Sequence, residues 1–335
     1  MNPRIASMAY AVPPDIVNVQ TVMTNEKTRI EAVFAQMSQR LKKRTLEGLG
    51  MQHVRVCAGR GPYDLALEAA SRALEQARVA GSDLDLIIDF VTLPGKDGQY
   101  LSFAQKLSVE LGAETSLNLS FRVGGCGGLH LAMKNALALM AADENLRTAL
   151  LVTADSPPEG SRSLLPITIQ GDAGSAVVLT KREVAGPCVL GTEVLTLGHL
   201  YDTITISRSN TGMDNMVIDV DPVRIENELM PIYYLNYFRL IGKILDRFSL
   251  RLADIDYFFY SNLSGTDRNG FVKAMRLPEE KVITTGLAEY GHTFASDLVI
   301  NYVDFSRDHR LSPGQHMMFA SAGIGFTWGV TIARA

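Results

Sequence analysis

The stretch Gly124-Gly125-Cys126-Gly127-Gly128-Leu129 lies between a predicted strand and a predicted helix. Glycines on both sides of the cysteine permit a sharp turn and let a ligand approach the backbone closely. A cysteine at a helix start lies at the positive end of the helix dipole, which favours the thiolate. A free cysteine is usually a buried structural residue, but core packing has no need of four glycines around it. We therefore interpret Cys126 as a nucleophile.

Strands and helices alternate outward from this turn. Residues 5–11, 85–92, 116–120 and 147–154 are predicted as strands, and residues 62–80, 102–111 and 127–142 have apolar side chains at helical spacing. Such alternation is typical of an α/β fold with a largely buried sheet.

The pattern then repeats. Residues 84–88 match residues 255–259, and the turn Gly125-Cys126-Gly127 has a counterpart in Gly291-His292-Thr293. Two copies of one α/β unit imply a pseudo-twofold axis with equivalent turns meeting at its centre. We predict a first half, residues 1–181, that carries the cysteine, and a second half, residues 182–335, that carries the histidine. Residues 201–237 are the least regular stretch and are expected to form a substrate-facing insertion.

Composition narrows the function classes. The chain has 335 residues, of which 47% are hydrophobic, so it can bury a large core, and its net charge of −4 does not indicate nucleic-acid binding. Three dispersed cysteines without a CxxC motif indicate neither a disulfide framework nor a metal site, so Cys57 and Cys188 are interpreted as structural. The longest uncharged run, residues 317–333, is shorter than the roughly 20 residues of a membrane-spanning helix. We expect a cytoplasmic protein with no metal and no permanently bound cofactor.

Several motifs together resemble the thiolase superfamily, and within it ketoacyl-acyl-carrier-protein synthase III. They are the Cys126 turn, Gly171-Asp172-Ala173-Gly174-Ser175-Ala176, Tyr290-Gly291-x-Thr293 and Gly323-x-Gly325-Phe326-Thr327-Trp328-Gly329. The resemblance implies duplicated αβ units in a five-layered αβαβα arrangement and a homodimer. It also implies an oxyanion hole formed by the backbone N–H groups of Cys126 and Ile324. Acyl groups would come from coenzyme A or from the phosphopantetheine arm of a carrier protein.

The sequence departs from the synthases at two positions of their Cys-His-Asn triad. Ser261 stands where they have histidine, and His292 stands where they have asparagine. A Cys-His pair can still form a thiolate, accept an acyl group and activate an incoming nucleophile. A divergent branch of the family uses histidine with aspartate in this way, which makes Asp297 the expected partner of His292, with Asp304 as a rival.

Further residues are candidates for an alternative base, for the pocket wall and for docking. His199 is the alternative general base, and Ser261 and Asn262 are expected to line the pocket. A basic rim would help an acidic carrier protein to dock. The candidates are Arg268, Lys273 and Arg276, with a second basic run at Arg40, Lys42, Lys43 and Arg44, although a charge run is usually just a solvated face.

These observations predict an acyltransferase of secondary, polyketide-type metabolism. It would move an acyl group from a coenzyme A or carrier-protein thioester to a hydroxyl, amine or thiol. Two alternatives stay open: a decarboxylating Claisen-condensing enzyme that has rebuilt its site around His292, and a catalytically silent partner subunit of a heterodimer.

Overall fold

The computed structural model describes residues 2–25, 36–93, 102–122, 124–158, 160–208 and 216–335, and all structural statements concern these residues. Ten strands follow one another side by side in the order β14-β13-β15-β16-β10-β1-β9-β6-β4-β5. Their bounds are β1 Arg4–Ala11, β4 Leu86–Asp89, β5 Leu117–Ser120, β6 Thr148–Asp155, β9 Ala173–Thr180, β10 Cys188–Thr196, β13 Tyr257–Tyr260, β14 Val282–Ile283, β15 His316–Gly323 and β16 Thr327–Arg334.

Each half of the chain builds its part of this array with the same topology. From the outer edge inward, the first half runs β5-β4-β6-β9-β1 and the second half runs β14-β13-β15-β16-β10. When the five strands of each half are numbered in sequence order, both halves read 3-2-4-5-1. In both halves the two outer pairings are parallel and the two inner ones antiparallel. The halves join where Arg4 of β1 pairs with Cys188 of β10. Residue 181 lies in the connection between β9 and β10, and the division into two units at that point remains a prediction.

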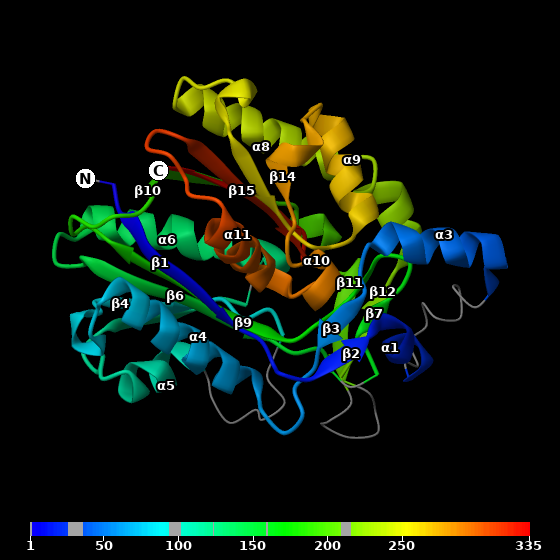
Figure 1. Cartoon of the computed structure of the whole chain (residues 1–335), viewed down its shortest axis with the longest axis horizontal. Helices are drawn as coiled ribbons and strands as arrows, with labels where there is room; N and C mark the ends of the chain where they lie inside the picture. The colour runs from blue at the N-terminus through cyan, green and yellow to red at the C-terminus, as the bar shows by residue number, and fades with distance from the viewer. Residues whose placement is uncertain (1, 26–35, 94–101, 123, 159, 209–215) are drawn as a thin grey trace.

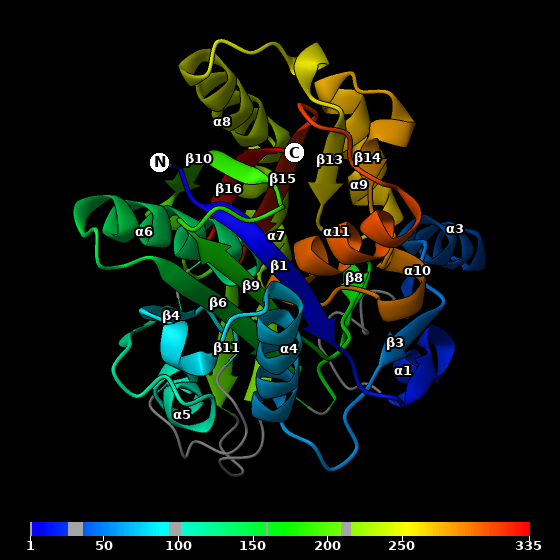
Figure 2. The same cartoon turned by 60° about the vertical axis from the view of Figure 1, so that its left-hand side comes forward.

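Helices cover both faces of each half-sheet and also fill the space between them (Figure 1). On the outer face of the first half, α4 (Pro62–Ala77) and α5 (Phe103–Glu110) pack on β4, β6 and β9. On the outer face of the second half, α8 (Tyr233–Arg247) and α9 (Gly265–Met275) pack on β13, β15 and β16. Figure 2 shows these outer helices at opposite ends of the molecule.

Two helices, α6 (Gly128–Ala142) and α11 (Asp297–Asp308), form the central layer. One core cluster joins Leu129 and Met133 of α6 and Leu298 of α11 to strands of both halves, including Ile88 and Phe319. The layers therefore alternate helix, sheet, helix, sheet, helix. The predicted α/β thiolase-like fold is confirmed, and it brings the starts of α6 and α11 together at the centre.

Most of the remaining elements lie in the right-hand half of the molecule as drawn in Figure 1. Within residues 201–237, Ile204–Arg208 pairs with Met216–Val220 and a short helical stretch leads into α8. Residues 209–215 lie outside the described part of the chain, and the substrate-facing insertion remains a prediction. No described helix is both long and apolar enough to cross a lipid bilayer. The bounds of these elements are α1 Val19–Asn25, α3 Gln39–Leu49, α7 Pro222–Arg224, α10 Leu287–Tyr290, β2 Ile16–Asn18, β3 His53–Arg55, β7 Ser163–Leu164, β8 Thr168–Ile169, β11 Ile204–Arg208 and β12 Met216–Val220.

Candidate active site

Cys126 lies in a 3₁₀ turn, Gly125–Gly127, that leads directly into α6. The glycines are needed because this turn touches the β15–β16 turn. A Cβ atom on Gly125, whose φ is +49°, would lie 2.6 Å from the backbone nitrogen of Ile324, and a Cβ on Gly323 would lie 2.2 Å from that of Cys126. The Ser321 hydroxyl also donates a hydrogen bond of 2.9 Å to the Cys126 carbonyl. The nucleophile turn is therefore fixed against the second half of the chain.

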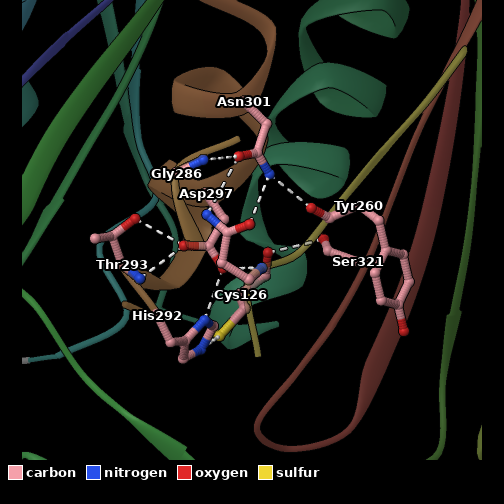
Figure 3. A network of polar contacts seen from close by, with 9 residues as sticks. Cys126, Tyr260, Gly286, His292, Thr293, Asp297, Asn301 and Ser321 are labelled. Carbon is pink, nitrogen blue, oxygen red and sulfur yellow. Dashed lines mark hydrogen bonds and ion pairs between the residues drawn. The ribbon is translucent and has the colours of Figure 1, made fainter. Parts of the chain in front are cut away.

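His292 follows Gly291, whose positive φ of 65° turns the chain after α10. The His292 N–H donates to the Ile169 carbonyl at 3.0 Å, and the His292 carbonyl accepts from the Gly171 N–H at 3.0 Å. These bonds fix the backbone of the histidine to the first half. The side chain then faces the cysteine, with Nε2 3.1 Å from Cys126 Sγ (Figure 3).

Asp297 is the first residue of α11 and is completely buried. Its Oδ2 lies 2.7 Å from His292 Nδ1 and accepts a 2.7 Å bond from the Asn262 N–H. Its Oδ1 accepts 2.7 Å bonds from both the N–H and the hydroxyl of Thr293. Because His292 lies before the helix, the spacing of five residues does not separate the two side chains. The structure thus brings Cys126, His292 and Asp297 into one line of contacts.

A buried asparagine supports the segment that binds Asp297. Asn301 of α11 donates to the Tyr260 carbonyl at 2.8 Å and to Asn262 Oδ1 at 2.9 Å, and it accepts from the Gly286 N–H at 2.9 Å (Figure 3). It therefore holds the segment whose N–H binds Asp297. The sequence interpretation missed this residue. Its signal was a polar side chain four residues after Asp297, on the same face of a buried helix.

The electrostatics of His292 follow from these contacts. Burial alone would lower the pKa of His292, but Cys126 and Asp297 outweigh it, so the pKa is raised well above its usual range. The imidazolium form is therefore favoured beside the cysteine sulfur. A thiolate–imidazolium pair is the form that attacks thioesters.

Cys126 and His292 both line a cavity of about 560 Å³. Residues between 204 and 230 supply part of its apolar wall, and α3 lies along another side. Ile324, in the turn between β15 and β16, also lines the cavity. The two expected oxyanion donors, the N–H groups of Cys126 and Ile324, therefore belong to turns that meet at the cavity wall. The apolar lining residues are Leu41, Leu164, Pro166, Ile167, Ile204, Ile225, Leu229, Met230, Leu263, Phe294, Ala322 and Phe326.

Two residues expected in the pocket lie elsewhere. Ser261 and Asn262 are buried but are not among the residues that line the cavity; their neighbours Leu263 and Ser264 are. The side chain of Asn262 is instead engaged with Asn301. Ser261 therefore has no contact with the cavity that would let it replace the missing histidine.

The rival residues are placed apart from the cysteine. His199 is exposed and does not line the cavity. His130 is completely buried beside the Thr331 hydroxyl, and burial lowers its pKa to about 3. Asp304 accepts a bond from the Tyr10 hydroxyl and pairs with Arg307, so it does not orient His292.

The predicted docking residues divide into two kinds. Lys273 and Arg276 are exposed at the end of α9, whereas the guanidinium of Arg268 donates to the carbonyls of Glu279 and Val282. The second basic run lies on α3, which packs against α9, and Arg44 of that helix lines the cavity. Of the two basic runs, the one on α3 therefore reaches the cavity.

The comparisons with known proteins point to the same family. A family model described as the C-terminal part of 3-oxoacyl-[acyl-carrier-protein] synthase III matches residues 245–335. A β-ketoacyl-[acyl-carrier-protein] synthase III from Hyphomonas neptunium is 28% identical over 331 residues, covering 94% of this chain and 95% of that protein. A second one, from Paramagnetospirillum magneticum, is 26% identical over 297 residues, covering 86% and 88%.

Solved structures of low sequence identity share the fold. The synthase III of Aquifex aeolicus superposes with a TM-score of 0.81 at 19% identity, covering 99% of this chain and 100% of that one. A structure named ChlB3, an acyltransferase, gives 0.82 at 20% identity, covering 100% and 98%. OleA of Xanthomonas campestris, with bound lauric acid and lauroyl-CoA, gives 0.80 at 16%, covering 100% and 99%. This protein has the thiolase fold and is similar in sequence, over most of its length, to ketoacyl-acyl-carrier-protein synthase III.

Proposed function

We propose that the protein is an acyltransferase that forms an acyl-thioester on Cys126 and passes the acyl group to a hydroxyl, amine or thiol. The Cys126 thiolate attacks the thioester carbonyl, the bond to the donor sulfur breaks, and the departing thiol takes its proton from His292. His292 then accepts the proton of the acceptor as that group attacks the acyl-enzyme, and Cys126 leaves as thiolate. The backbone N–H groups of Cys126 and Ile324 are the proposed donors to the oxyanion of both steps.

One observation carries the choice of transfer over condensation. A decarboxylating enzyme needs two donors around the thioester oxygen of its malonyl group, to stabilise the enolate. Of the two positions that supply them in the synthases, the one occupied by His292 lines the cavity and the one occupied by Ser261 does not. In addition, His292 is held by Asp297 at 2.7 Å, in the manner of a general base with its orienting carboxylate.

The silent-subunit alternative is less well supported. Cys126 lies 3.1 Å from the buried His292, and the buried Asp297 lies behind the histidine. Apolar residues would stabilise the core at least as well as these buried polar groups, so their presence supports a catalytic role. The condensing alternative keeps the same nucleophile and differs in the step after acylation.

Acylation of Cys126 is the first test. Intact-protein mass after incubation with a panel of acyl-CoA thioesters should show one adduct of the acyl mass. Cys126→Ala should lose the adduct and all turnover. Cys188→Ala, which removes a partly buried free thiol far along the chain, is the matched control and should keep both. If the wild-type protein stays unmodified with every donor in the panel, the proposal is refuted.

The partners follow from the cavity and its surroundings. We propose coenzyme A thioesters or acyl-phosphopantetheine as donors, with Arg44, Lys273 and Arg276 attracting the phosphates or an acidic carrier protein. An exposed contact of this kind weakens with salt, since the Debye length falls from about 10 Å at 0.1 M to about 3 Å at 1 M. KM for the donor should therefore rise with salt; a KM that salt does not change would exclude this docking.

We propose a homodimer formed through β5, the strand at the outer edge of the first half. Leu117 on this strand is 44% exposed, and an unpaired edge invites pairing with another chain. Light scattering should give about twice the chain mass of 36.6 kDa; the single-chain mass across micromolar concentrations would contradict it. The unpaired thiols suit a reducing compartment, so we place the protein in the cytoplasm of a cell with a polyketide-type pathway.

A further inference from the structure

A carboxyl group lies in the wall of the largely apolar catalytic cavity. Asp267, in the first turn of α9, lines the cavity together with Cys126 and His292, and only 8% of it is exposed. Its Oδ1 accepts a 3.0 Å bond from the Tyr234 hydroxyl. Its Oδ2 has no hydrogen-bond partner of ordinary length among the described residues, and no described cationic side chain forms an ion pair with it.

Such a group needs an explanation. Burial raises the pKa of Asp267 to about 6, against the opposing effects of the Tyr260 and Tyr234 hydroxyls and of His292. The carboxyl is therefore mostly ionised at pH 7. A buried carboxylate is costly unless it is paired with a cation or with hydrogen-bond donors. The Tyr260 and Tyr234 hydroxyls act on this carboxyl, but no described cationic side chain pairs with it, so the missing cation is expected from a ligand.

Two other lining side chains agree with this. Gln170 and Thr168 line the same cavity and are 2% and 1% exposed, and Gln170 Oε1 and Thr168 Oγ1 have no partner among the described residues. Both atoms can accept hydrogen bonds, as the free carboxylate oxygen can. The cavity wall thus offers several acceptors to a ligand that brings donors.

We propose that Asp267 binds a protonated amine of the acyl acceptor, and that a hydroxyl of the same molecule receives the acyl group. This deepens the proposed function and rests on it. A protonated amine has no lone pair, so it cannot be the nucleophile while it is bound; it anchors the acceptor. The hydroxyl oxygen attacks the acyl carbon, its proton passes to His292 Nε2, and the bond from that carbon to Cys126 Sγ breaks.

The choice of acceptor over donor follows from charge. The pantetheine arm of the donor offers neutral amide N–H groups, whereas an ammonium also neutralises the carboxylate. A hydrogen bond between charged partners gives roughly tenfold to hundredfold in binding. An effect on acylation of Cys126, rather than on transfer, would assign Asp267 to the donor and overturn the proposal.

The experiment compares matched acceptors on the preformed acyl-enzyme. Amino alcohols from ethanolamine to aminohexanol are set against neutral alcohols with equal numbers of heavy atoms, from propanol to heptanol. The best amino alcohol should be acylated at least tenfold faster, in kcat/KM, than its neutral match at pH 7.5. Asp267→Asn should remove this preference through KM and leave the rate of Cys126 acylation unchanged.

Controls and pH make the outcome specific. Asp246→Asn removes an exposed carboxyl of α8 and should retain the preference. The preference should disappear as the pH falls through about 6, because Asp267 then becomes neutral. The ratio of the two acceptor rates cancels the titration of His292, which both share. The other titratable or charged groups around Asp267 or on its cavity are Tyr233, Tyr237, Tyr260 and Arg44.

A wild-type protein without any preference, or a preference that Asp267→Asn keeps, would overturn the inference. Failure of every donor to acylate Cys126 would instead refute the proposed function, so the two failures are distinguishable.

Discussion

The two turns that meet at the centre of the molecule occupy equivalent positions in the two halves, but different groups hold them in place. The Cys126 turn precedes α6 and consists mostly of backbone, with glycines that let Ile324 approach. The His292 turn precedes α11 and is held by side chains, with Asp297 accepting four hydrogen bonds and Asn301 fixing the segment behind it. One half presents an accessible nucleophile, and the other holds a base in a fixed orientation.

This difference shows how a duplicated fold separates two tasks. A nucleophile must be approached by substrate, so small residues surround it. A base must keep one tautomer and one orientation, so buried polar groups surround it. If this is correct, changes in the second turn should impair transfer more than they impair acylation of the nucleophile.

Among changes in the second turn, the largest effect should come from His292→Ala. A positioned general base contributes about 10²–10⁴-fold, so transfer should fall by that order, while slow acylation of Cys126 persists. Single-turnover kinetics of the acyl-enzyme with an alcohol acceptor would measure it. His199→Ala, an exposed histidine outside the cavity, is the control and should transfer normally. If both variants behave alike, the second turn is not catalytic.

Asp297→Asn should reduce transfer less than His292→Ala, because the aspartate acts through the imidazole. It should also lower the pKa of His292, which the Asp297 charge helps to raise. The proton of His292 would then be lost at a lower pH than in the wild type. The rate of Cys126 alkylation by iodoacetamide as a function of pH reports this change. An unchanged profile would mean that Asp297 does not influence the pair.

A smaller effect is expected for Asn301→Leu, a change of similar size that removes the amide. It leaves the Gly286 N–H and the Tyr260 carbonyl without their partner, which costs about 1–3 kcal/mol of stability. Loosening the segment that binds Asp297 should lower kcat roughly tenfold, with KM unchanged. Asn135→Leu on α6, whose amide bonds only to Leu131 among the described residues, is the matched control. Loss of stability without loss of kcat would make Asn301 purely structural.

Much of this arrangement could be predicted from the sequence, because local patterns determine it. Glycines around Cys126 and before His292 indicated the two turns, and the repeat of residues 84–88 at residues 255–259 indicated their meeting. The alternation of strands and helices indicated the layers. The strand expected at residues 85–92 is shorter, Leu86–Asp89, because the N–H groups of Thr92 and Leu93 turn to the Asp155 carboxylate.

The features that could not be predicted depend on contacts between distant segments. The basic helix α3 looked like a solvated face, yet one side of it lines the cavity. Ser261 was expected to line the pocket because of its place in the motif, yet the chain turns it away. Asp267 resembles an ordinary acidic residue in the first turn of a helix, and only the packing of α8, with Tyr234 against α9, reveals that it is buried.

The most direct measurement uses a malonyl thioester with a carbon label in its free carboxylate. We expect that a malonyl group, if it loads Cys126 at all, is transferred to the acceptor with its carboxylate intact, so that the product keeps the label. One missing enolate donor costs roughly 10²–10³ in rate, which should suppress decarboxylation on the timescale of transfer. Labelled carbon dioxide released in step with product would contradict transfer without condensation and identify a condensing enzyme.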